Sequence, residues 1–204
     1  MNKSLQILWL FAIFTLQLRF EARAYDGLDI VILHSYEKGN VWTDGVDQSF
    51  KRNLKTSQKS TVVYSEFMDS KRFFGKAYEE QLKKIYKKKY KHQSIDLIIT
   101  SDDIAFDFAI ANRKEIFNNA PIIFSGVNGY DSIKEELYKS EGRFTGVVET
   151  FDIAKTLNLA LKLHPGTKRV YVINTKHSQT GKYLRKQFEK SLSKFETALE
   201  ITYV

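Results

Sequence analysis

Three consecutive polar residues, Ser101, Asp102 and Asp103, follow a short apolar run near the middle of the chain. The run, residues 95–100, is rich in β-branched residues and is typical of a strand buried on both faces of a parallel sheet. Ser101 is a good N-cap for a following helix, and the helix dipole favours carboxylates in the first turn. Ligands of open α/β sheets bind at the carboxyl ends of strands, so either carboxylate is placed to pair with an amine.

Two other interpretations of this motif stay open. Serine followed by two carboxylates is a common helix start that needs no ligand. The backbone N–H groups of such a start also bind anions, although two adjacent carboxylates argue against an anionic ligand here.

Other predicted strand ends carry aromatic and hydrogen-bonding side chains, which together are typical of small-molecule clefts. Tyr36 and Trp42 would enclose an apolar or planar part of a ligand, although Trp42 is equally consistent with packing between lobes. Asn174 and Thr180, at the two ends of a predicted polar loop, would contribute from a second lobe. The full set of predicted ligand-binding residues is Ser35, Tyr36, Trp42, Ser101, Asp102, Asp103, Ser125, Asn128, Asn174 and Thr180.

Catalysis is not expected. His34, Ser35 and Asp102 have the residue types of a nucleophilic triad, but neighbouring side chains at a strand end usually point to opposite sides, and the sequence has no Gly-x-Ser-x-Gly elbow. The four histidines lack metal-ligand spacing, there is no cysteine, and no glycine-rich phosphate loop occurs. A phospho-receiver domain would need an acidic pair after the first strand, where this chain has His-Ser-Tyr. We therefore predict no enzyme activity, no metal and no cofactor.

The elements that must position these residues alternate between strand and helix. Such alternation predicts a parallel sheet with helices on both faces. After residue 130 we expect a short polar helix, a short strand, and then an amphipathic helix capped by Asp152, which begins a second lobe. The strands expected for the first lobe are residues 28–33, 61–67, 95–100, 120–124 and 144–149. The predicted divisions are residues 1–24, 25–150 and 151–204.

The first 24 residues resemble a targeting segment. Lys3 precedes an apolar run, residues 5–18, and Ala22-Arg23-Ala24 has the form of a signal-peptidase site. We predict cleavage before Tyr25 and a periplasmic or otherwise extracytoplasmic protein. The alternative is an uncleaved anchor, but the run is shorter than the roughly 20 residues of a spanning helix.

The net charge of +8 does not predict nucleic-acid binding. The densest lysine run, residues 83–91, falls largely on one face of a predicted helix whose other face carries Tyr78, Leu82, Ile85 and Tyr86. A solvated helix face explains this run better than a binding patch.

Several motifs are similar, in order and spacing from about Leu28 to Val204, to one protein family. They resemble the substrate-binding proteins of ABC transporters with the periplasmic binding protein type I fold. The nearest branch is the one used as the extracytoplasmic sensor of histidine kinases and diguanylate cyclases. The motifs are Leu-His-Ser-Tyr at 33–36, Trp-Thr-Asp at 42–44, Phe-Met-Asp-Ser-Lys-Arg-Phe at 67–73, Ser-Asp-Asp at 101–103, Phe-Ser-Gly-Val-Asn at 124–128, Thr-Gly-Val-Val-Glu at 145–149 and Leu-His-Pro-Gly-Thr-Lys at 163–168.

The resemblance implies two α/β lobes that close on a small solute at their facing strand ends, without catalysis or cofactor. Its partners would be a small-molecule ligand and either an ABC permease or a membrane sensor protein. The family's second lobe has more strands and helices than residues 151–204 supply, so we predict a complete first lobe and a partial second lobe. The alternative is an interaction module that binds no ligand, whose second lobe another chain completes and whose strand edge at residues 199–204 invites pairing.

Overall fold

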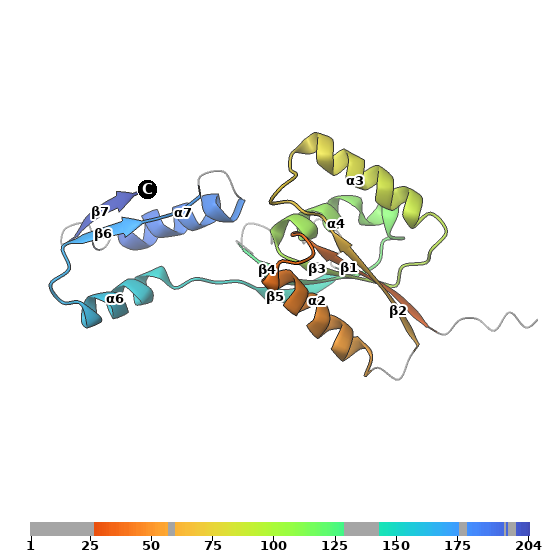
Figure 1. Ribbon diagram of the computed structural model, residues 1–204, viewed down its shortest axis with the longest axis horizontal. Coiled ribbons are helices and arrows are strands. Elements are labelled where there is room, and N and C mark those ends of the chain that lie inside the picture. The colour runs from red at the N-terminus through yellow and green to blue at the C-terminus, as the bar shows by residue number, and fades with distance from the viewer. Residues whose placement is uncertain (1–26, 57–59, 129–142, 176–178, 194, 196–198) are drawn as a thin grey trace, which may run out of the picture.

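A computed structural model describes residues 27–56, 60–128, 143–175, 179–193, 195 and 199–204 (Figure 1). Strands and helices alternate along most of the chain. The strands are β1 (Leu28–His34), β2 (Thr61–Phe67), β3 (Leu97–Ser101), β4 (Ile122–Val127), β5 (Phe144–Val148), β6 (Arg169–Val172) and β7 (Glu200–Tyr203). The helices are α2 (Val41–Leu54), α3 (Lys76–Lys89), α4 (Asp103–Ile116), α6 (Ile153–Leu163) and α7 (Gln179–Leu192).

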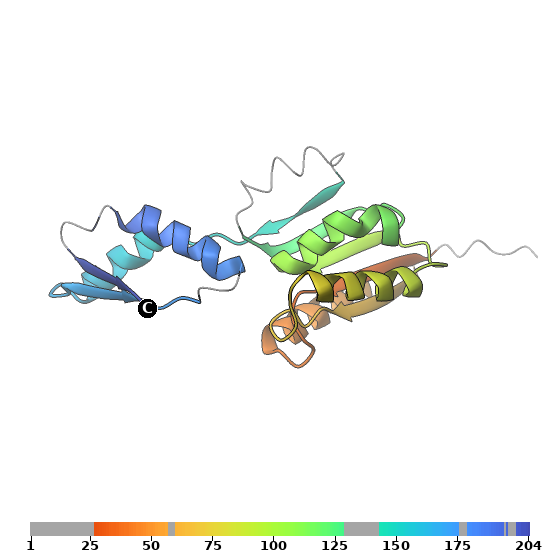
Figure 2. The ribbon, with the colours of Figure 1, turned by 90° about the horizontal axis from the view of Figure 1, so that it is seen from above.

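The first five strands form one parallel sheet in the order β2-β1-β3-β4-β5. Helix α2 covers one face, where Phe50 and Leu54 pack on Ile30 and Ile32. Helices α3 and α4 cover the other face (Figure 2). The core on this side includes Phe106. The predicted α/β class, with a parallel sheet between helices, is confirmed.

Strand order fixes where a ligand site belongs in this sheet. The chain leaves β1 toward β2 on one side and then returns to β3 on the other side of β1. The chain therefore leaves β1 and β3 toward helices on opposite faces of the sheet. In open α/β sheets the crevice for ligands lies between two such connections, at the carboxyl ends of the strands. Residues 34–36 and 101–103 lie at this point.

The remaining described elements form a smaller unit, in which β6 and β7 pair in parallel. Ile153 and Leu157 of α6 and Leu192 of α7 pack with Val172 in one apolar cluster. On the other side of β6, Tyr171 is 60% exposed. The predicted boundary near residue 150 falls in the connection between β5 and α6.

Four local predictions are wrong. Ser101 is the last residue of β3, paired with both His34 and Ser125, so the N-cap of α4 is Asp102. Strand β4 continues to Val127 because β5 pairs with its full length. Helix α7 begins at Gln179, which places Thr180 in its first turn rather than in a loop. Ile85 is 57% exposed, because Tyr78, Leu82 and Tyr86 already form the buried stripe at four-residue spacing.

Two predictions, the targeting segment at residues 1–24 and the short helix after residue 130, lie outside the described residues. Among the helices that the structure describes, none combines the length and the apolar character needed to cross a membrane.

Candidate functional site

Ser35 connects the two loops at the crevice between β1 and β3. Its Oγ donates a hydrogen bond to the carbonyl of Ser101 at 2.9 Å and accepts one from the N–H of Ala105 at 2.8 Å. Both serines are buried. Their role is therefore to hold the loop after β1 against the start of α4, rather than to contact a ligand directly.

Asp102 has an unusual backbone for a residue with a side chain. Its φ of 75° and ψ of 169° lie in a region that is almost restricted to glycine, and such a conformation costs about 1–3 kcal/mol. Its N–H donates to the carbonyl of Ser125 at 2.8 Å, and its carboxylate accepts from the N–H of Asp103 at 3.2 Å. These bonds fix the carboxylate at the mouth of the crevice, where Tyr36 also hydrogen-bonds to it.

Asp103 is buried and holds Asn128 by two hydrogen bonds. Its Oδ1 accepts from the backbone N–H of Asn128 and its Oδ2 from the side-chain Nδ2, both at 2.9 Å. Asn128 is only 6% exposed, and among the residues that the structure describes its Oδ1 has no hydrogen-bond partner. A buried acceptor without a partner is costly, and such an atom at the carboxyl end of a sheet is suited to a donor from a ligand.

The smaller unit reaches this site through Thr180. The Thr180 Oγ1 lies 3.5 Å from Asp103 Oδ2, and the Thr180 side chain also hydrogen-bonds with Tyr36. Asn174 does not contact the site. Its Nδ2 donates to the carbonyl of Gly181 at 2.8 Å, which fixes the start of the helix that carries Thr180.

Negative charge dominates the electrostatics. Burial raises the pKa of Tyr36, and the charge of Asp102 raises it further. Burial likewise raises the pKa of Asp102, against the hydrogen bond from Tyr36. Burial and then the charges of Asp102 and Asp103 raise the pKa of Glu149. Burial is the largest cause of each shift, and the neighbouring carboxylates add to it by disfavouring a further negative charge.

Sequence reasoning missed two members of this group. Glu149, which the prediction included in the strand 144–149, directly follows β5, and its side chain interacts with Asn128. Lys71, in the loop after β2, places its Nζ 4.0 Å from the centroid of the Tyr36 ring. The position of each at a strand end was the available signal.

Two predicted residues lie differently from the expectation. Trp42 is in the first turn of α2 and is 56% exposed, with no described contact to the acidic group formed by Asp102, Asp103 and Glu149. Ser125 pairs with Ser101 inside the sheet, and its carbonyl rather than its side chain supports Asp102. Tyr36, Asp102, Asp103, Asn128 and Thr180 are brought together.

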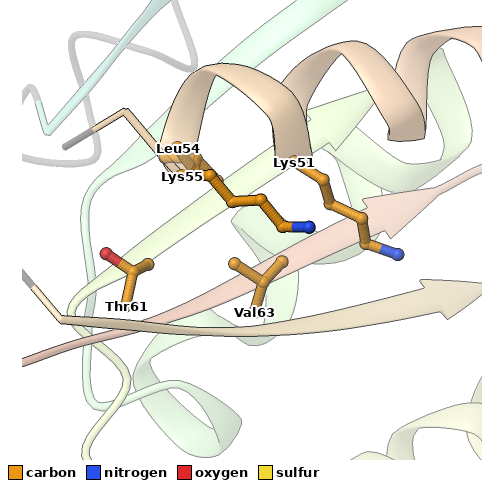
Figure 3. A pocket seen from close by; sticks show the side chains of 5 residues that line it. All are labelled: Lys51, Leu54, Lys55, Thr61 and Val63. Carbon is orange, nitrogen blue, oxygen red and sulfur yellow. The ribbon is translucent and has the colours of Figure 1, made fainter.

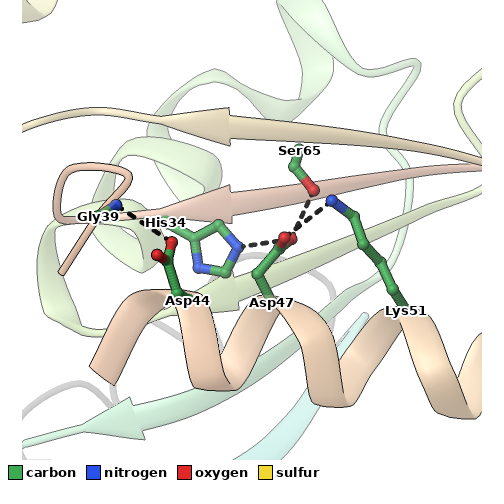
Figure 4. Close-up of polar contacts among 6 residues, drawn as sticks. All are labelled: His34, Gly39, Asp44, Asp47, Lys51 and Ser65. Carbon is green, nitrogen blue, oxygen red and sulfur yellow. Dashed lines mark hydrogen bonds and ion pairs between the residues drawn. The ribbon is translucent and has the colours of Figure 1, made fainter. Parts of the chain in front are cut away.

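A second polar cluster lies under α2, on the far side of β1 from α4 (Figure 4). Asp47 accepts hydrogen bonds from Ser65 at 2.6 Å and Lys51 at 2.8 Å, and its Oδ1 is 3.2 Å from His34 Nε2. His34 is fully buried and stacks on Phe67. This cluster joins α2 to β1 and β2, and a solute would not reach the imidazole without displacing the helix.

A cavity of about 440 Å³ lies between α2 and β2 (Figure 3). Lys51, Leu54, Lys55, Thr61 and Val63 line it. Thr61 begins β2, so this cavity lies toward the amino end of the strand, away from the crevice where sheets of this order bind ligands. We do not assign it to the site.

No protein-family model matches the chain, and no curated protein matches it. Among solved structures, a conserved domain protein from Vibrio cholerae O1 biovar El Tor is similar over 87% of this chain and 56% of that chain, at 14% identity and a TM-score of 0.58. An ABC domain in complex with L-Trp from Streptococcus pneumoniae matches 87% of this chain and 57% of that chain, at 14% identity and a TM-score of 0.56. A periplasmic binding protein from Burkholderia mallei matches 88% and 46%, at 13% identity and a TM-score of 0.53.

These likenesses confirm the predicted periplasmic-binding-protein-like fold. At such identities they show the fold alone. The chain spans about half the length of the solved proteins that it matches.

Proposed function

We propose that this protein is an exported solute-binding protein that holds a small molecule between its two α/β lobes and performs no chemistry on it. The observation that carries the proposal is the meeting of Tyr36, Asp103 and Asn128 with Thr180 of the second unit. Polar groups from two lobes converge at the strand ends where open α/β sheets bind ligands.

The similar structures support binding rather than catalysis. One is a complex with L-Trp and another is described as a periplasmic binding protein. Export and cleavage before Tyr25 follow from the sequence pattern of residues 1–24. Delivery of the solute to an ABC permease and signalling through a membrane sensor protein use the same clamp, so both fit this proposal.

Thermal unfolding of the purified protein against amino acids, amines, sugars, purines and carboxylates tests solute binding. A ligand that binds only the folded state stabilises it by roughly 2.7 kcal/mol at a hundredfold excess over Kd. We expect one chemical class to raise Tm with increasing concentration, and the double variant Tyr36→Phe/Asn128→Ala to lose this shift while unfolding cooperatively. A cooperative transition that no compound shifts would contradict the proposal.

A second candidate function, protein association, is favoured by the surface along β6. A cavity of about 570 Å³ runs beside this strand, and Phe151, Tyr171 and Phe188 are among its lining residues. Described strands pair with β6 on one side only, through β7, whereas β1 is paired on both sides. In this alternative a strand of another chain completes the second lobe. The predicted strand edge at residues 199–204 is in part occupied, since β7 pairs with β6.

Sedimentation velocity at increasing protein concentration separates the two candidates. Association that disappears in the double variant Tyr171→Lys/Ile173→Lys, but persists in the control Lys168→Glu, supports strand addition at β6. A monomer at every concentration argues against it.

A further inference from the structure

We propose that the solute carries a protonated amine, and that this ammonium group replaces the Lys71 ammonium beside Tyr36 and Asp102. The inference rests on the proposed solute binding and assigns its ligand class. In the crevice Asn128 would accept a hydrogen bond from the cation, and the carboxyl groups of Asp102, Asp103 and Glu149 would attract its charge.

The charges that face the crevice are unbalanced. Asp102 interacts with Tyr36, Asp103 and Lys71, and Glu149 interacts with Asp102 and Asp103. Three carboxyl groups therefore share one lysine among the charged groups that the structure places around them. Burial is the largest cause of the raised pKa values of Asp102 and Glu149, and the neighbouring carboxylates raise them further. A ligand cation would compensate this negative charge.

A separate observation, the Asn128 side chain, indicates a hydrogen-bond donor on the ligand. Asn128 Nδ2 is bonded to Asp103 Oδ2, while the same side chain interacts with Glu149. The amide is thus held between two carboxyl groups, and its buried Oδ1 accepts no hydrogen bond from the described part of the chain. An ammonium group has three N–H donors and no acceptor, so one N–H can donate to Asn128 Oδ1 while another donates to a neighbouring carboxylate.

The position of Lys71 explains how the site exists without a ligand. Its Nζ lies 4.0 Å from the Tyr36 ring centroid, and its charge lowers the pKa of Asp102. The residue itself is exposed and belongs to a loop, so its flexible side chain moves away at little cost. Lys71 therefore provides a weak internal cation that a better-placed ligand cation displaces.

An inorganic cation fits less well. Among the residues that the structure describes, no three histidine or acidic side chains are grouped closely enough to hold a metal ion. Tyr36 and Thr180 hydroxyls beside the carboxylates favour an organic ammonium group, whose donors point to separate acceptors.

Two matched sets of compounds test the ligand class. L-tryptophan, tryptamine and indole-3-propionate share one skeleton, as do L-norvaline, butylamine and pentanoate. Isothermal titration calorimetry at pH 7 should show at least tenfold weaker binding when the amine is removed from a skeleton that binds. Binding by indole-3-propionate or pentanoate without their amine counterparts would overturn the inference and leave solute binding intact. If no compound of the wider thermal screen binds, both proposals fail.

Charge variants then test the role of each side chain with the amine that binds. Glu149→Gln should weaken binding about tenfold, whereas Glu79→Gln, at an exposed position on α3, should not change it. Lys71→Gln should strengthen binding severalfold because it removes the competing cation. The control Arg72→Gln lies in the same loop, where Arg72 pairs with Asp69 rather than with Tyr36.

The signs of these changes decide the outcome. Weaker binding in Lys71→Gln would mean that Lys71 contacts an anionic group of the ligand, and it would overturn the displacement. Unchanged binding in Glu149→Gln would mean that the Glu149 carboxyl group does not contribute to recognition of the amine. Affinity for the amine should also rise between pH 4 and pH 7 as Asp102 and Glu149 ionise, and Glu149→Gln should reduce this pH dependence.

Discussion

Strands β1 and β6 are each the first strand of their sheet in chain order, but they differ in how far other strands and helices cover them. The last five residues of β1 are buried, with β2 on one edge, β3 on the other and helices over both faces. In β6 only Val172 is buried, and β7 pairs with a single edge. Parallel sheets normally require cover on both faces, so the two units differ in stability as well as in size.

This difference suggests different roles for the two units: the first lobe is the scaffold of the site, and the second unit closes on it. The first lobe builds the strained Asp102, the Ser35 connection and the Asp103–Asn128 pair entirely from its own strands and helices. The second unit adds Thr180 at the start of α7. We therefore expect the acidic group to persist when the second unit is perturbed, and solute binding to require both.

Truncation of the two cores should give the largest contrast. Phe106 is fully buried, with its ring 4.8 Å from that of Phe124, whereas Leu157 is 8% exposed in the smaller cluster. Phe106→Ala should lower the free energy of unfolding by about 3–5 kcal/mol, and Leu157→Ala by about 2 kcal/mol or less. Urea denaturation measures both. Equal losses would mean that the smaller unit buries its core side chain as effectively as the first lobe does.

The close approach of β4 and β5 offers a second perturbation of the first lobe. A Cβ at Gly146 would lie 2.1 Å from the carbonyl oxygen of Phe124, so the strands must move apart to accept any side chain. Gly146→Ala should cost about 1–3 kcal/mol, as overpacking does. Gly45→Ala, where a Cβ meets open space on α2, is the matched control and should not destabilise. Equal behaviour of the two variants would contradict the close spacing of β4 and β5.

The sequence predicted the first lobe well because buried parallel strands leave continuous apolar runs. The runs at β1, β2 and β3 have no other good interpretation, and alternation with amphipathic helices then determines the sheet class. The capping residue of α4 was harder to predict from the sequence. Ser101 is the better N-cap by type, but pairing with His34 and Ser125 keeps it in the strand, and Asp102 takes the cap with positive φ.

The site was predicted in part for a related reason. Side chains that immediately follow strands, such as Tyr36, Asp103 and Asn128, could be placed from topology alone. Lys71 reaches the crevice through a loop path that no periodic pattern encodes. Glu149 directly follows β5, but the predicted strand, residues 144–149, included it. Trp42 has the right type but faces solvent, because Asn40 caps α2 and sets the orientation of its first turn.

Acid should weaken the cluster under α2. Burial lowers the pKa of His34 below its ordinary value of 6.5 despite the nearby Asp47; Lys51 also lowers it, and Asp44 raises it. Protonation of the imidazole therefore favours the unfolded chain, and this contribution to stability is lost as pH falls through about 6.5. Asp102 and Glu149 act oppositely, since their raised pKa values favour the folded state as pH falls.

The contribution of His34 is thus the difference between the parent and His34→Gln in the stability that each loses on acidification. Urea denaturation at pH 7 and pH 5 should show that the parent loses more stability on acidification than the variant does. Identical losses would mean that His34 does not titrate below its ordinary pKa. The exposed His164→Gln serves as the control and should follow the parent.

The smallest expected effect concerns the backbone of Asp102. Asp102→Gly and Asp102→Asn both remove the carboxylate, but only glycine adopts a φ of 75° and ψ of 169° without strain. Relief of about 1–3 kcal/mol of strain, less the roughly 0.5–1 kcal/mol that glycine's greater freedom costs on folding, leaves the glycine variant about 1 kcal/mol more stable than the asparagine variant. Urea denaturation compares them directly. A glycine variant that is more stable yet binds no amine would show that the first lobe keeps a strained residue because the site needs its carboxylate there, whereas equal stabilities would mean that the strain is relieved in solution.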